Sequence, residues 1–146
     1  MKGKDMTTDN LSNGSGTIDD VIGIYFDKAK KTIGRAESNL NDGDIDTAVN
    51  RAYYAVFYIM TAMMLVQGEA FSSHKQLITN FNKVYIRTGL LPKEYGAKIS
   101  KCQRLRHQGD YEPYPYISYQ DAKEQIAFAS NLYQKCMTLQ REKSEI

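Results

Sequence analysis

The sequence predicts an all-α fold, an antiparallel bundle of about five helices. Apolar residues recur at steps of three and four through most of the chain, which is the pattern of helices with one buried face. No segment shows the alternation of apolar and polar residues that strands joined by hairpin turns require. Short polar breaks separate the periodic segments, and short loops between amphipathic helices make neighbouring helices antiparallel.

The composition is that of one ordinary globular domain. The chain has 146 residues, 25% of them charged, and a formal net charge of +2, so attraction to nucleic acid must come from a local patch. No apolar signal segment opens the chain, so we expect a cytoplasmic protein. We expect residues 1–16 to be a disordered polar tail, 17–142 a single helical domain and 143–146 a frayed end.

The first two helices are predicted at about 18–40 and 44–67. Residues 41–44 (Asn-Asp-Gly-Asp) break the first apolar stripe, and Gly68 suits the position that ends the second helix. The second helix is apolar on nearly all sides after Arg51, which is typical of a central helix. Its apolar run is shorter than the roughly 20 residues of a membrane span, so no membrane association is expected.

Three further helices complete the predicted bundle. The third is expected to begin at Ser72 or Ser73 and to end at Gly89. The fourth is expected over about 92–109, with Pro92 in its first turn. Two prolines within 112–116 prevent a helix there, and Ser118 is the expected N-cap of the last helix.

The two cysteines give no sign of a metal or redox centre. Cys102 and Cys136 lie 34 residues apart, within helical patterns, and no zinc-type spacing of Cys or His occurs. We expect both to be small buried apolar residues in a reducing compartment. Neither a metal nor a cofactor is predicted.

Two polar clusters interrupt the apolar pattern of the second and third helices. Arg51 stands beside Tyr54 in an apolar helix, so it is either paired structurally or faces a phosphate from a pocket wall. His74 and Lys75 follow the serines at a predicted helix start, where free N–H groups favour anions. The plainer alternative there is ordinary capping by serine.

A third cluster lies at the end of the fourth helix. Lys101, Arg104 and His107 follow one another at about one turn and share a face, whereas Arg106 points toward the apolar side of that helix. Several tyrosines follow, beginning with Tyr111. Arginine grips phosphate and tyrosine stacks on bases, so this is a candidate surface for RNA or a nucleotide. The alternative is a charged face that is merely solvated.

These clusters together resemble the HEPN-domain family. Residues 50–57 (Asn-Arg-Ala-Tyr-Tyr-Ala-Val-Phe) resemble its signature second helix, 73–77 its third helix, and 105–111 (Leu-Arg-His-Gln-Gly-Asp-Tyr) the end of its fourth. The similarity covers about 18–139. It is strongest to the small stand-alone branch that is often encoded beside a minimal nucleotidyltransferase.

The resemblance implies a helical bundle that dimerises, and often a metal-independent ribonuclease that acts as a toxin or in RNA defence. The active site of such enzymes is an Arg followed after four to six residues by a His, paired across the dimer. Some partner nucleotidyltransferases silence them by adding AMP to a nearby tyrosine. Here Arg106 matches the arginine and Tyr111 the position of a modifiable tyrosine, but no His stands at the required spacing.

The sequence therefore predicts a HEPN-type module that binds RNA or a nucleotide, the toxin-side partner of a nucleotidyltransferase antitoxin, with a degenerate catalytic motif. One alternative is an active metal-independent endoribonuclease, and another is a non-catalytic homodimeric interaction protein. We expect Arg51, His74 and Arg106 to converge. The catalytic candidates are Arg106, His107, Asp110 and Tyr111, although a carboxylate such as Asp110 is a poor acid at neutral pH. The binding candidates are Arg51, Tyr54, His74, Lys75, Lys101 and Arg104.

Overall fold

The computed structural model describes residues 17–113 and 116–144, and over this part of the chain it is helical with no strand, which confirms the all-α prediction. The predicted tail over 1–16 and the last two residues lie outside the described part. The elements are α2 (Thr17–Asn41), α3 (Ile45–Val66), α4 (His74–Phe81), the π-helical turn η1 (Asn82–Ile86), α5 (Tyr95–Tyr111) and α6 (Tyr119–Ser144).

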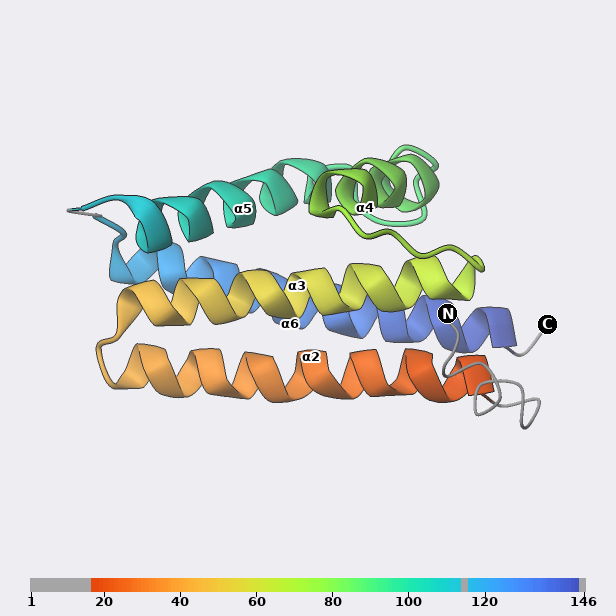
Figure 1. Ribbon diagram of the computed structural model, residues 1–146, viewed down its shortest axis with the longest axis horizontal. Helices are drawn as coiled ribbons and strands as arrows, with labels where there is room; N and C mark the ends of the chain where they lie inside the picture. Colours follow the sequence, from red (N-terminus) through yellow and green to blue (C-terminus); the bar gives the residue numbers. More distant parts are fainter. Residues whose placement is uncertain (1–16, 114–115, 145–146) are drawn as a thin grey trace.

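Helix α3 is the centre of the bundle, as its all-round apolar sequence predicts. It packs against α2, α4, α5 and α6, and α2 runs antiparallel beside it (Figure 1). The small side chains of Ala48, Ala52, Ala55 and Ala62 are fully buried and let these neighbours approach closely. By length and composition α3 alone among the described helices could span a membrane, but its apolar side chains are largely buried inside the bundle, as in a core helix.

Several helix ends are confirmed by their caps. The Ser73 Oγ accepts a hydrogen bond from the Gln76 N–H at 3.3 Å, and the Ser118 Oγ accepts one from the Asp121 N–H at 3.0 Å. Gly68, two residues after the end of α3, has a φ of +79°, a left-handed conformation that favours glycine. These caps fix where α4 and α6 begin.

Several helix boundaries from α4 onward differ from the prediction. The third helix is not one α-helix to Gly89, because α4 ends at Phe81 and continues as the π-helical turn η1. Helix α5 begins only at Tyr95, whose N–H donates to the Pro92 carbonyl at 3.0 Å, and it ends at Tyr111 instead of Gly109. Helix α6 extends to Ser144, past the predicted boundary at 142.

Gly109 lies inside α5, at a position where a side chain would crowd its neighbours. A Cβ at this position would lie 3.1 Å from the Ile117 Cδ1 atom and 3.6 Å from the Asp46 Cβ atom. The glycine therefore allows the end of α5 to approach the start of α3 and the segment before α6. This close approach keeps the last turn of α5, with its polar side chains, against α3.

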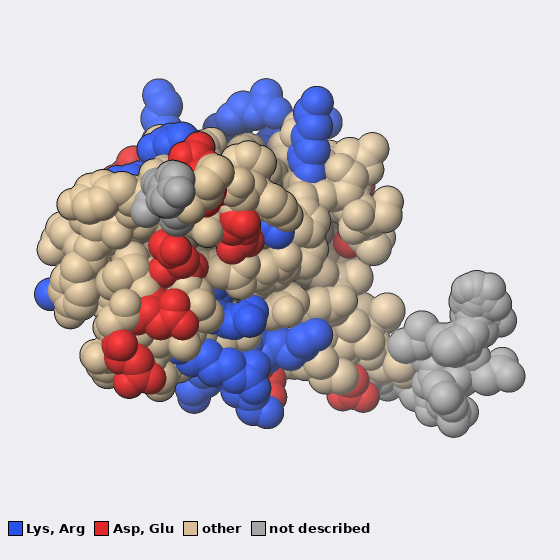
Figure 2. Space-filling model, turned by 60° about the vertical axis from the view of Figure 1, so that its left-hand side comes forward, with Lys and Arg blue, Asp and Glu red and all other residues tan. Residues whose placement is uncertain are grey.

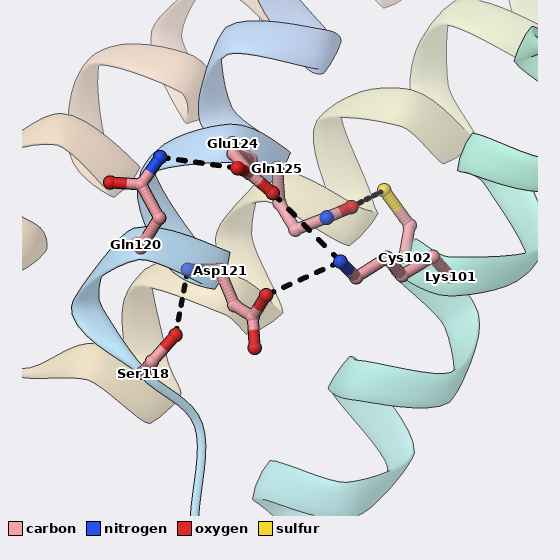
Figure 3. Close-up of polar contacts among 7 residues, drawn as sticks. All are labelled: Lys101, Cys102, Ser118, Gln120, Asp121, Glu124 and Gln125. Atoms are coloured by element: carbon pink, nitrogen blue, oxygen red, sulfur yellow. Dashed lines mark hydrogen bonds and ion pairs between the residues drawn. The ribbon is translucent and has the colours of Figure 1, made fainter.

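The cysteines are buried and separate, as predicted. Burial raises the pKa of both thiols to about 12, so neither forms a thiolate near neutral pH. The Cys102 Sγ donates a hydrogen bond to the Oε1 of Gln125 at 2.8 Å, which joins α5 to α6 (Figure 3). Gln125 is itself buried, and this bond satisfies its carbonyl oxygen.

Candidate functional site

Polar and aromatic side chains from three helices meet around Arg106. Helix α5 supplies the arginine, α3 supplies neighbours spaced three or four residues apart on one face, and α4 supplies a histidine from its first turn. We call this group the Arg106 cluster, and its members are Asn50, Tyr53, Tyr54, His74, Arg106, Asp110 and Tyr111.

Polar contacts hold the guanidinium of Arg106 on two sides. Its Nη2 donates a hydrogen bond to the Tyr54 hydroxyl at 3.1 Å. Its Nε lies 3.2 Å from the Asp110 Oδ2, as an ion pair whose N–H is not aligned for a hydrogen bond. The same Asp110 oxygen accepts a hydrogen bond from the Asn50 Nδ2 at 2.9 Å. Asp110 therefore positions the arginine, and the Nη1 makes no hydrogen bond with the described residues.

Three tyrosine rings surround the same guanidinium. The Arg106 Cζ lies 5.3 Å from the ring centre of Tyr53 and 5.6 Å from those of Tyr54 and Tyr111, distances at which a cation is attracted to an aromatic face. Burial alone would lower the pKa of Arg106, but Tyr54, Tyr111 and Asp110 outweigh it, and the pKa is raised. The arginine is a fixed, permanently charged group whose side chain is 21% exposed.

His74 adjoins the arginine through a shared neighbour. Its Nδ1 lies 2.7 Å from the hydroxyl of Tyr53, the ring of which also faces Arg106. Its own ring lies 4.2 Å from that of Phe57, centre to centre. Burial, and then the positive charge of Arg106, lower the pKa of His74 from its ordinary value of 6.5. At neutral pH the imidazole is therefore uncharged and its Nε2 makes no hydrogen bond with the described residues.

The lowered pKa of His74 predicts a measurable pH dependence. The unfolded chain takes up this proton near pH 6.5 and the folded chain only at a lower pH, so stability falls as the pH drops between the two values. The chain has two histidines, so NMR titration with His107→Gln as the assignment variant follows His74 alone. We expect His74 to titrate below 6.5, and Arg106→Gln to raise its pKa. Titration at or above 6.5 in the wild type would contradict this account.

The predicted convergence holds for His74 and Arg106 but is wrong for Arg51. Arg51 lines a groove between α2 and α3 together with Lys31 and Arg35, and it makes none of the contacts to Arg106. Arg51 comes directly after Asn50, which faces α5, and successive residues of an α-helix are rotated by about 100°. This rotation turns Arg51 toward α2. Tyr54 lies between the two directions.

The predicted basic face of α5 is divided. The Lys101 Nζ lies 3.2 Å from the Asp121 Oδ1 and 3.8 Å from the Glu124 Oε1, so its charge is turned toward α6 (Figure 3). Arg104 is exposed. His107 is exposed and stacks on Tyr111, one turn later, at 4.9 Å between ring centres. Lys75 is exposed at the start of α4 and does not join the cluster.

Sequence reasoning did not assign roles to Tyr53 and Asn50, which hold His74 and Asp110 in place. Their spacing from Tyr54 contained the signal, because positions 50, 53, 54 and 57 share one face of a helix. Metal ligation has no support among the described residues, which contain no group of three or more Asp, Glu, His or Cys side chains suited to a metal ion.

The fold and the cluster define a class of protein. It is a small helical module in which a tyrosine-rich central helix holds an arginine at the end of the penultimate helix, as the HEPN resemblance implies. Comparison with known families agrees, since the sequence profile of the HEPN domain matches residues 23–142. The chain belongs to the HEPN domain family.

Relatives of the chain are found in bacteria and archaea. It is 30% identical to a UPF0332 protein of Thermotoga maritima, over 73% of this chain and 80% of that protein. It is 31% identical to a UPF0332 protein of Gloeobacter violaceus, over 77% of this chain and 90% of that protein. It is 29% identical, over 67% of each chain, to a Methanocaldococcus jannaschii protein whose name reads "Putative toxin". The chain is thus similar to toxin-like HEPN proteins.

Proposed function

We propose that this protein is a toxin-type HEPN module that binds RNA or a nucleotide through a phosphate at the Arg106 cluster. The observation that carries the proposal is the fixed guanidinium. Arg106 is held by Tyr54 and Asp110 and keeps its Nη1 without a hydrogen bond among the described residues. Arginine pairs well with phosphate oxygens, and a guanidinium that is already ordered loses little entropy when it binds one.

The surroundings of the arginine support a nucleotide as its ligand. One carboxylate, that of Asp110, contacts the arginine, and it is shared with Asn50. Tyr111 is 62% exposed next to the guanidinium and offers a ring on which a base can stack. An arginine beside an open aromatic ring matches the two parts of a nucleotide, its phosphate and its base.

A second candidate function, metal-independent RNA cleavage, is favoured by one observation. The family's catalytic histidine is missing from the sequence after Arg106, yet His74 reaches the same cluster from α4. With its Nδ1 bound to Tyr53, the Nε2 of a neutral His74 is the nitrogen that exchanges a proton. In the tautomer whose Nδ1–H donates to the Tyr53 oxygen, it would take the proton of the RNA 2′-hydroxyl as that oxygen attacks phosphorus. Arg106 would stabilise the added charge, and the 5′-oxygen would leave with a proton from solvent.

One assay separates these two functions. The wild type and His74→Asn would be incubated with a mixed pool of fluorescent transfer and messenger RNA in EDTA, with binding and cleavage followed in parallel. Binding without cleavage by both proteins supports the binding module. Cleavage by the wild type that His74→Asn loses, with binding retained, supports the nuclease. A wild type that neither binds nor cleaves RNA, and binds no fluorescent nucleotide in a parallel titration, contradicts both functions and favours a non-catalytic interaction protein.

We also propose that the protein acts in the cytoplasm as a homodimer and as the toxin-side partner of a minimal nucleotidyltransferase. The similarity to toxin-like HEPN proteins supports a partner antitoxin.

The exposed Tyr111 supports modification, in which its hydroxyl oxygen attacks the α-phosphate of ATP, loses its proton and displaces pyrophosphate. The mass of one AMP on the Tyr111 peptide, absent in Tyr111→Phe, is the expected result. An unmodified peptide after incubation with the neighbouring nucleotidyltransferase would contradict it.

A further inference from the structure

A second cationic surface lies on the α2 side of α3, away from the predicted basic face of α5. Figure 2 shows Lys and Arg side chains gathered in a patch on the lower part of the molecule, where α2 and α3 lie, with acidic side chains gathered beside it. A groove between the two helices is lined by Lys31, Gly34, Arg35, Ser38, Asn39, Thr47 and Arg51. We call it the α2–α3 groove. Its lining has three cations, three neutral polar side chains and no acid.

The charges of the α2–α3 groove are largely uncompensated. Arg35 and Arg51 form no ion pair within 4.0 Å among the described residues. Lys31 pairs with Asp27 one turn earlier on α2 at 3.1 Å, but both side chains are more than 60% exposed, where such a pair contributes little. Three cations that face one groove repel one another, and an anion bound between them would relieve that repulsion.

Tyr54 lies between this groove and Arg106, and further aromatic side chains lie beside it. Tyr54 lies one turn after Arg51 on α3, and its hydroxyl accepts the hydrogen bond from Arg106. The ring of Tyr58 lies 6.3 Å from that of Tyr54 and 6.2 Å from that of Tyr25 on α2. These three rings are half-buried, so each keeps part of its surface open. Tyr54 therefore lies on α3 between Arg51 at the groove and Arg106 of the cluster, with further tyrosine rings beside it.

We infer that the α2–α3 groove binds the phosphate backbone of single-stranded RNA that extends from the Arg106 cluster. This inference rests on the proposed function and names its ligand, because a free nucleotide has no backbone to reach a second site. A group of cations with open aromatic rings beside it suits a single strand, whose bases are free to stack. Duplex RNA hides its bases and is recognised mainly by shape.

The test measures the salt dependence of binding to a fluorescent single-stranded oligoribonucleotide by full-length protein. The double variant Arg35→Ala/Arg51→Ala should bind more weakly and lose about 1.4 from the slope of log affinity against log salt, at about 0.7 for each phosphate contact. Lys123→Ala/Lys135→Ala removes the same charge from exposed positions on α6 and should retain the wild-type slope. Arg106→Ala, measured in parallel, reports on the cluster itself.

The other possible outcomes distinguish failure of the groove inference from failure of the proposed function. If Arg106→Ala weakens binding and the groove variant matches the α6 control, the inference about the groove fails and the proposed function stands. If the wild type binds no RNA, the inference about the groove fails, and the proposed function stands only if the wild type binds a free nucleotide that Arg106→Ala does not. If duplex RNA of the same length binds as tightly as the single strand, and loses as much in the groove variant, the single-strand assignment is overturned. Circular dichroism of each variant establishes that lost binding does not reflect lost helix.

Discussion

Replacing Arg106 by alanine is expected to reduce RNA affinity about 10- to 100-fold, the range of a hydrogen-bonded contact to a charged group. The change removes the guanidinium that Asp110 and the three tyrosines around it hold in place. It also leaves Asp110 with only its hydrogen bond to Asn50, so an anionic ligand would meet an uncompensated carboxylate. Fluorescence anisotropy at fixed salt measures the change.

Two matched variants show whether the loss of affinity depends on the planar donor geometry of the Arg106 guanidinium or on its charge alone. Arg106→Lys keeps the positive charge but loses the planar donors, so its affinity should fall between those of wild type and alanine variant. Lys101→Ala removes a cation from the same helix whose charge is already paired with α6, and it should leave affinity nearly unchanged. Equal losses in Lys101→Ala and Arg106→Ala would contradict a role for the cluster.

Replacing Tyr53 by alanine is expected to destabilise the fold by about 3–5 kcal/mol, the usual cost of deleting a buried aromatic ring. Tyr53 is 2% exposed, on the face of α3 that meets both α4 and α5. Its loss opens a cavity and removes the hydroxyl that holds His74. Urea denaturation followed by circular dichroism measures the free energy of unfolding.

Tyr53→Phe is the matched variant for this prediction. It keeps the ring that packs in the core and faces Arg106, and it removes only the hydroxyl, so the loss should be about 1 kcal/mol. RNA affinity should be retained in Tyr53→Phe, while any cleavage that depends on His74 should fall. A phenylalanine variant as unstable as the alanine variant would show that the hydrogen bond, and not the ring, holds α4 in place.

The fold could be predicted from the sequence because its signals are local. The apolar stripe of α2, the all-round apolar α3 and the caps Ser73 and Ser118 each depend on a few neighbouring residues. The π-helical turn after Phe81 could not be predicted, since one extra residue in a turn leaves the apolar spacing almost unchanged. The extension of α5 past Gly109 could not be predicted either, because glycine is typical of a helix end and its close approach to Ile117 is a tertiary contact.

The candidate site was only partly predictable, for a related reason. Arg106, His74 and Tyr54 could be proposed because each lies in a short local motif that resembles the HEPN family, but their meeting depends on how three helices are rotated. The same rotation turns Arg51 toward α2 and Lys101 toward α6, which composition does not reveal. The spacing of Tyr53 and Tyr54 places both on one face of α3, but it does not reveal that Arg106 of α5 faces them.

RNA is proposed to bind where α3 and α5 meet, and photo-crosslinking reports this position directly. A single-stranded RNA that carries 4-thiouridine would be irradiated with the full-length protein, and the crosslinked peptides identified by mass spectrometry. The account predicts crosslinks within residues 50–58 of α3 and 106–111 of α5 that disappear in Arg106→Ala. Crosslinks confined to the exposed face of α6 around Lys123 and Lys135, unchanged in Arg106→Ala, would contradict it.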